Sequence, residues 1–209
     1  MTQKRAILAL KVMLWLCALA PGGWLLAGLF RGWLGANPVE KLTHVTGMTT
    51  LVLLLLTLSV TPVRRFTRWN PVIHLRRPMG LFAFFYALVH FNIWFAFDLV
   101  FDLTYMIEDV VERPYITVGF SAFVVLIPLA ATSTKGWIRR LGRKWAKLHK
   151  GVYLATTLGV VHFYWLVKAD TRLPLLLGSC LAVLLLLRTP YLTRTRKKGR
   201  AASGLANTG

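Results

Sequence analysis

Six long apolar runs decide what this chain can fold into, because each has to be tested as a membrane-spanning segment. The runs cover roughly residues 6–30, 42–61, 79–99, 115–132, 151–167 and 173–187. A helix that crosses the hydrocarbon core typically has about 20 residues, and about 17 is the lower limit. The sixth run is shorter than this, so its helix must include flanking residues in order to span. Inside a bilayer the backbone polar groups must be bonded within their own segment, which favours helices.

The sequence therefore predicts an all-α integral membrane protein, with six transmembrane helices in residues 1–193 and a polar, disordered tail in residues 194–209. The composition agrees, since 56% of the residues are hydrophobic and the mean hydropathy is +0.57, more than the surface of a soluble domain allows. The first run resembles a signal peptide, but it is longer than a signal's apolar region, so we expect a retained helix. No internal repeat and no second domain is evident.

The charged residues lie between the apolar runs and predict the orientation of the chain. The net charge is +19, but basic residues at the ends of spans contact anionic lipid headgroups, so we exclude nucleic acid as a partner. With the N-terminus in the cytoplasm, most of the 26 basic residues fall in cytoplasmic segments. All seven acidic residues fall on the other side: Glu40, Asp98, Asp102, Glu108, Asp109, Glu112 and Asp170. The positive-inside rule therefore places both termini in the cytoplasm.

Two of the loops carry predicted structure of their own. Acidic and apolar residues alternate along residues 98–112, which predicts a short helix lying in the membrane interface. Residues 135–150 predict a basic amphipathic helix that leads into the fifth span.

Histidine is the ionisable residue that the spans do contain, and neutral imidazole is a ligand that suits iron and burial together. His90 lies eleven residues into the third run, and His162 lies thirteen residues beyond His149 at the inner start of the fifth. At about 1.5 Å of rise per residue, His90 and His162 reach similar depths in the outer half of the bilayer. Two imidazoles on different helices at one depth are what bis-axial ligation of haem iron requires.

The helix faces beside these two histidines leave room for a flat macrocycle. Small residues line each face on the inner side: Gly80, Ala83 and Ala87 before His90, and Gly151, Ala155 and Gly159 before His162. Tyr86 and Leu158 interrupt them, and would have to swing aside or pack on the edge of the macrocycle. The alternative is that the small residues serve close helix packing around hydrogen-bonded histidines.

The remaining candidates lie nearer the ends of the spans. His149 is roughly 140° around the helix from His162 and cannot serve the same site; it binds a second haem, touches a flavin, or is an interfacial histidine. His44 begins the second span at the outer face, where it lines the haem edge, helps electrons to leave, or is a surface histidine. Arg76 and Arg77 have the geometry to grip a flavin phosphate.

No Gly-x-Gly-x-x-Gly fingerprint, P-loop or Ser-His-Asp set is present, so electrons must come from a partner or a quinol rather than from a nicotinamide bound by this chain.

Several short motifs follow one another along the six runs: Gly-Ala-Asn-Pro-Val at 35–39, His-Val-Thr-Gly at 44–47, Thr-Pro at 61–62, Arg-Pro-Met-Gly-Leu at 77–81, Arg-Pro-Tyr-Ile-Thr-Val-Gly at 113–119, Thr-Ser-Thr at 132–134, Trp-Ala-Lys-Leu-His at 145–149 and His-Phe-Tyr-Trp at 162–165. In this order, and over nearly the whole chain, they resemble the MsrQ (YedZ) family.

The resemblance implies a ferric-reductase-like bundle in the bacterial inner membrane, with b-type haem and FMN as cofactors. It implies that His90 and His162 are the axial ligands of the outer haem, that His149 matches the inner histidine of the fifth span, and that His44 matches a family histidine of uncertain role. It also implies a periplasmic partner, the molybdopterin enzyme MsrP, which reduces methionine sulfoxide in oxidised envelope proteins.

One departure from the larger relatives of this fold affects the number of cofactors. Those relatives carry two histidines on the third span, whereas here the run holds His90 alone and His74 lies outside it. One haem and an inner flavin therefore fit the residues better than two haems.

The predicted function is electron transfer from a quinol or a cytosolic flavin reductase to MsrP, with no substrate chemistry on this chain. The alternatives are a stand-alone ferric or quinone reductase, and a non-redox channel or assembly factor.

Overall fold

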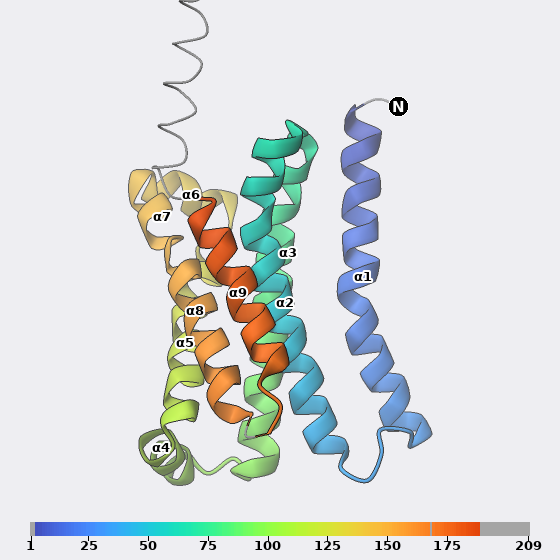
Figure 1. Ribbon diagram of the computed structural model, residues 1–209, viewed down its shortest axis with the longest axis vertical. Helices are drawn as coiled ribbons and strands as arrows, with labels where there is room; N and C mark the ends of the chain where they lie inside the picture. The colour runs from blue at the N-terminus through green and yellow to red at the C-terminus, as the bar shows by residue number, and fades with distance from the viewer. Residues whose placement is uncertain (1–2, 168, 189–209) are drawn as a thin grey trace, which may run out of the picture.

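The protein is a bundle of antiparallel helices (Figure 1). The computed structural model describes residues 3–167 and 169–188, and no strand occurs among them. Six helices run along the long axis of the molecule, alternately up and down: α1 (Gln3–Arg31), α2 (Pro38–Thr67), α3 (Arg76–Ile93), α5 (Pro114–Ala131), α8 (Gly151–Leu166) and α9 (Arg172–Leu186). The prediction of an all-α fold is confirmed. The predicted tail, residues 194–209, lies outside the described residues.

Four helical stretches are long and apolar enough to cross a membrane: Gln3–Arg31, Pro38–Thr67, Asn70–Asp98 and Pro114–Ala131. The stretch from Asn70 combines η1 (Asn70–Leu75, 3-10 helical), α3 and η2 (Trp94–Asp98, π-helical). By length and composition the chain is a membrane protein. Helices α8 and α9 have 16 and 15 residues, so a count of six spans stays a prediction.

Short helices close the two ends of the bundle. Helix α4 (Leu103–Glu112) lies across one end, which we call the α4 end (Figure 1). Helices α6 (Lys135–Leu141) and α7 (Arg143–Leu148) lie at the other end, together with the start of α1 and the end of α9; we call this the α6–α7 end. The prediction of one continuous helix over residues 135–150 is wrong, because Gly142 adopts φ +49° and separates α6 from α7.

Local sequence explains where the helices near the α4 end begin. Asn37 caps α2: its side-chain oxygen accepts a hydrogen bond from the backbone N–H of Glu40 at 3.2 Å, and Pro38 occupies the first turn. Proline fits there because its missing N–H is not needed in the first turn. Asp102 caps α4 in the same way, accepting from the backbone of Thr104 at 2.7 Å. These caps satisfy N–H groups that a helix cannot bond internally.

Two helix pairs, α2 with α3 and α5 with α8, form the most extensive packing in the bundle. Their facing sides contribute most of the main core, which includes Leu54, Leu58, Ala83, Leu126 and Ala155. Buried hydroxyls bond within their own helix: Thr46 to the Leu42 carbonyl, Thr57 to Leu53 and Thr156 to Val152. These bonds let polar side chains sit in an apolar core.

Helix α1 is joined to the bundle through Tyr86. The Tyr86 hydroxyl accepts from the backbone N–H of Gly22 at 3.0 Å and donates to the carbonyl of Ala18 at 2.6 Å. An undisturbed α-helix joins that N–H and that carbonyl directly. Pro21 lies next to Gly22 and has no N–H of its own, so the tyrosine bridges α1 beside a proline.

Candidate functional site

The rings of His90 and His162 face the same space between α3 and α8. Their centroids are 6.4 Å apart, and their planes cross at 81°. Both residues lie near the C-terminal ends of their helices, which puts them toward the α4 end of the bundle. The structure thus brings together the two histidines that the sequence placed at one depth.

Each of these rings is held by a backbone carbonyl of the neighbouring helix. Nδ1 of His90 lies 2.9 Å from the carbonyl oxygen of Thr43 on α2, and Nδ1 of His162 lies 2.7 Å from that of Tyr115 on α5. A carbonyl only accepts, so Nδ1 carries the hydrogen and donates it in both rings. This tautomer leaves the lone pair on Nε2, the state of a histidine prepared to bind a metal through that atom.

A glycine lies against each of the two rings, one helical turn beyond the carbonyl that holds it. A Cβ on Gly47 would stand 2.9 Å from Cε1 of His90, and a Cβ on Gly119 would stand 2.6 Å from Nδ1 of His162. Any side chain at these positions would displace the imidazole. Glycine therefore allows the helix backbone to approach the ring closely.

The two halves of the site repeat each other at a constant spacing of 72 residues. Each unit has a carbonyl that accepts from the histidine ring, a glycine four residues after that carbonyl, and the histidine 47 residues after it. Further pairs at the same spacing line one cavity: Leu51 and Phe123, Leu54 and Leu126, Ala87 and Gly159, Phe91 and Phe163. The expectation that the chain has no internal repeat is therefore wrong: α2–α3 and α5–α8 present matching halves.

The cavity between the halves has a volume of about 810 Å³, within the range of cofactor pockets. An imidazole nitrogen lies about 2.0–2.1 Å from a bound first-row metal such as zinc, so two imidazoles on opposite sides of one metal would have centroids roughly 6 to 6.5 Å apart. The observed separation of 6.4 Å falls in that range. Ring spacing, tautomer and cavity together fit a planar macrocycle with a central iron.

The small residues beside the histidines divide between two roles. Ala87, Ala155 and Gly159 line the cavity, as room for a macrocycle requires. Ala83 does not line the cavity and is packed in the core, as in the alternative of close helix packing. Tyr86 turns to α1 instead of the cavity, so it needs no rearrangement to leave the space free.

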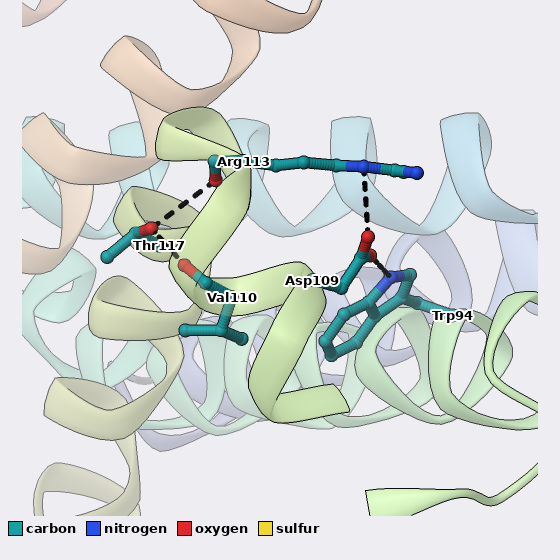
Figure 2. A network of polar contacts seen from close by, with 5 residues as sticks. All are labelled: Trp94, Asp109, Val110, Arg113 and Thr117. Atoms are coloured by element: carbon teal, nitrogen blue, oxygen red, sulfur yellow. Dashed lines mark hydrogen bonds and ion pairs between the residues drawn. The ribbon is translucent and has the colours of Figure 1, made fainter. Parts of the chain in front are cut away.

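Polar residues gather where the cavity reaches the α4 end. Asn37, Glu40, Asp98 and Arg113 line it there, whereas the remainder is mostly apolar apart from the histidines and a few threonines. Arg113 forms an ion pair with Asp109, 2.9 Å from Nε to Oδ1 (Figure 2). Sequence reasoning did not single out Arg113, Thr43, Tyr115, Gly47 or Gly119 as site residues; the 72-residue spacing was the pattern that could have revealed the last four.

His44 lies at the wall of the same cavity. Its ring is 6.2 Å from that of Phe163 at 59°, and it lines both the main cavity and an apolar groove of about 430 Å³ between α1 and α2. In the part of the chain that the structure describes, no hydrogen bond joins His44 to His90 or His162. The structure therefore places His44 beside the candidate site, as one of its lining residues.

His149 lies at the α6–α7 end, away from the histidine pair. Its ring stacks on Trp145 with centroids 4.0 Å apart, and Nε2 lies 3.1 Å from the Thr132 hydroxyl. That hydroxyl donates its hydrogen to the carbonyl of Pro128 at 2.6 Å, so Nε2 of His149 donates to it. Burial, and then the nearby Arg76 guanidinium, lower the pKa of His149. In this arrangement Nε2 is occupied by a protein partner.

The two candidate arginines differ in their surroundings. Arg76 is half-buried close to Arg188 and Tyr153, while Arg77 is exposed. Arg188 bonds the Tyr153 hydroxyl and the Leu58 carbonyl, and its guanidinium lies over the Tyr153 ring at 5.2 Å from the centroid. All seven acidic residues of the sequence are in segments at the α4 end. The cations at the α6–α7 end therefore have no carboxylate side chain of this protein to pair with.

Comparison with known proteins gives consistent relatives. Residues 44–160 match the family described as ferric reductase like transmembrane component. A protein of Herminiimonas arsenicoxydans named protein-methionine-sulfoxide reductase heme-binding subunit MsrQ is 48% identical over 95% of this chain and 92% of its own length. Proteins of the same name from Bordetella pertussis and Ralstonia nicotianae are 47% and 44% identical, over 94% and 98% of this chain and 96% and 95% of their own lengths. No solved structure matched the chain.

Proposed function

Because the chain belongs to the MsrQ family of ferric-reductase-like transmembrane proteins, we propose that it carries electrons through the membrane on one b-type haem held by His90 and His162. The observation that carries this proposal is the pair of imidazoles 6.4 Å apart, each with Nδ1 bonded to a carbonyl. Haem iron would supply one-electron chemistry that no side chain here provides. The names of the relatives, which describe a heme-binding subunit, support the same cofactor.

In this proposal the residues of the site position the cofactor and set its potential. Thr43 and Tyr115 fix the orientation of the two imidazoles and make them better electron donors by accepting the Nδ1 hydrogens. The apolar lining from Leu54, Leu126 and their neighbours excludes water, which also tunes the potential. The ring of Phe163, beside His44, is part of the cavity wall.

The orientation follows from the charges at the two ends. The basic segments at the α6–α7 end belong in the cytoplasm, and the acidic α4 end belongs in the periplasm. We place all six long helices across the bacterial inner membrane, with both termini cytoplasmic. Helices α8 and α9 reach the required length by including flanking residues, as about 17 residues suffice.

Electrons would enter from a quinol or a cytosolic flavin reductase and leave to MsrP docked at the α4 end. FMN, which family resemblance suggests, would lie at the α6–α7 end near Arg76, Arg77 and His149, because arginine matches the geometry of phosphate. We assign His149 to this flavin site rather than to a second haem, because Thr132 occupies its Nε2. The sulfoxide chemistry would take place on the partner.

A haem and flavin count on the purified protein tests this proposal. We expect about one haem per chain, a Soret band that is lost in His90→Ala and in His162→Ala, and an unchanged band in His74→Ala, which alters an exposed histidine on η1. Full haem in both site variants would contradict the proposal. A protein without any Soret band would favour a channel or assembly factor, and rapid turnover with ferric chelates in the absence of a partner would favour a stand-alone reductase.

A further inference from the structure

Arg113 belongs to the motif that supplies the Tyr115 carbonyl, but its own side chain has no part in holding His162. It lies in the extended link between α4 and α5, and its carbonyl accepts from the backbone of Ile116 and Thr117 at 2.9 and 3.1 Å. The Thr117 hydroxyl lies within bonding distance of the carbonyls of Val110 and Arg113 (Figure 2). The backbone that carries Arg113 is therefore fixed where the cavity reaches the α4 end, the region lined by polar residues that we call the mouth of the cavity.

Arg113 is the single lysine or arginine among the described residues that line the cavity. Its Nε is bonded to Asp109, whose other oxygen accepts from the indole N–H of Trp94 at 3.3 Å (Figure 2). The Asp109 side chain is 13% exposed and that of Arg113 is 57% exposed. Asp109 thus holds the arginine through Nε, while the rest of the guanidinium remains accessible.

The lining of the cavity decides which way the acidic edge of a bound haem points. A carboxylate placed among Leu54, Leu126 and Ala155 would lose its hydration without gaining a partner, which costs several kcal/mol or more. The mouth, in contrast, offers polar groups. The two propionates of a haem between His90 and His162 must therefore lie at the α4 end.

The mouth is not neutral, however, because Glu40 and Asp98 also line it. Two incoming propionates would be repelled by these carboxylates unless a cation lies between them. A guanidinium has five N–H donors in a planar fork. With Nε on Asp109 and the Tyr115 hydroxyl nearby, it still has donors for a second carboxylate.

We propose that Arg113 is the positioning residue for the haem propionates, bridging one of them to Asp109 at the mouth of the cavity. This inference rests on the proposed haem between His90 and His162. The bridge orients the macrocycle, and it raises the haem potential because a nearby positive charge disfavours the ferric state, which carries one more positive charge than the ferrous state.

The test compares haem-loaded, full-length variants. Arg113→Gln removes the cation and Arg113→Lys keeps it without the fork. Asp109→Asn removes the anchoring charge. Arg172→Gln is the matched control, since it removes an exposed arginine at the same end that does not line the cavity. The readouts are the midpoint potential, and the propionate bending band in the resonance Raman spectrum.

We expect Arg113→Gln to lower the midpoint potential by up to about 59 mV, which for a one-electron couple corresponds to a tenfold change in the ferric-to-ferrous ratio. Asp109→Asn should raise the potential. Arg113→Lys should have a potential much closer to that of the wild type than Arg113→Gln has, and Arg172→Gln should leave the potential unchanged. The propionate band should shift in Arg113→Gln and should stay at the wild-type position in Arg172→Gln.

The same measurements can overturn the inference. If Arg113→Gln and Arg172→Gln give the same potential and the same propionate band, Arg113 does not bind a propionate. Should Arg113→Gln fail to accumulate, an unshifted potential in Asp109→Asn together with a wild-type propionate band in Arg113→Lys overturns the inference equally. Failure of the underlying proposal looks different, because a wild-type protein without a bis-histidine haem spectrum would refute the haem site itself.

Discussion

Gly119 lies so close to His162 that a Cβ atom would stand 2.6 Å from Nδ1 of the imidazole. Gly47 stands in the same relation to His90, with a Cβ 3.1 Å from Nδ1. Both distances concern the nitrogen that donates to the neighbouring carbonyl. The absence of a side chain at two positions on α2 and α5 is therefore what permits both histidine orientations.

Substitution of either glycine should weaken haem binding. We expect Gly119→Ala and Gly47→Ala to lower the haem bound per chain severalfold, because the methyl group pushes the ring off its carbonyl and turns Nε2 away from the metal. Gly80→Ala is the control, since a Cβ there meets nothing within 4 Å. A pyridine haemochrome assay on equal amounts of protein measures the effect, and equal haem in all three variants would count against the site.

Loss of the Tyr86 hydroxyl should loosen α1. We expect Tyr86→Phe to reduce the free energy of unfolding by about 1–3 kcal/mol, because the Gly22 N–H and the Ala18 carbonyl lose the group that bridges them. Tyr105→Phe, at a position that is 60% exposed, should have almost no effect. Thermal unfolding in detergent, with hydrogen exchange of α1, checks this expectation; an unchanged midpoint and unchanged exchange would show that the bridge is not needed.

The stability of the α6–α7 end should depend on the protonation of His149. Its pKa is lowered in the folded protein, while an unfolded histidine titrates near pH 6.5. The stabilisation from neutral His149 is therefore complete above about pH 6.5 and is lost as the pH falls through the lowered pKa of the folded state. We expect His149→Gln to abolish this part of the acid destabilisation and His74→Gln to retain it. Parallel pH profiles of unfolding for wild type and His149→Gln would rule the effect out.

Gly142 should not accept a side chain. It adopts φ +49° and ψ −123° between α6 and α7, a conformation that L-residues other than glycine disfavour by about 1–3 kcal/mol. We expect Gly142→Ala to destabilise the protein by that order. Gly136→Ala, inside α6 with its nearest contact at 3.9 Å, should be neutral or slightly stabilising. Thermal unfolding of both variants decides the matter, and equal midpoints would mean that the link relaxes without cost.

Much of the architecture could be predicted because hydropathy and helical geometry determine it. The six long helices coincide with the six apolar runs to within four residues at each end, except that α2 ends six residues later and α3 six residues earlier than predicted. The pairing of His90 with His162 followed from depth, since two helices of known rise that run in the same direction bring residues at similar positions to comparable heights. The break at Gly142 was missed because a continuous basic pattern gives no sign of a positive φ at one residue.

The internal repeat was hidden for a physical reason. The group that holds each imidazole is a backbone carbonyl, which threonine and tyrosine provide equally well, so Thr43 and Tyr115 need not resemble each other. The connections between the paired helices also differ, one being η1 and the other α6 with α7. Only the glycines, the histidines and a few lining residues have to match, so the 72-residue spacing is the single sequence signal of the repeat, and it is a sparse one.

The matching halves have a consequence for how such a protein can be assembled. A hairpin of two helices with one carbonyl, one glycine and one histidine makes half of a ligand cage and cannot enclose a cofactor alone. Joining two hairpins in one polypeptide raises their effective concentration, so the cage closes as an intramolecular event.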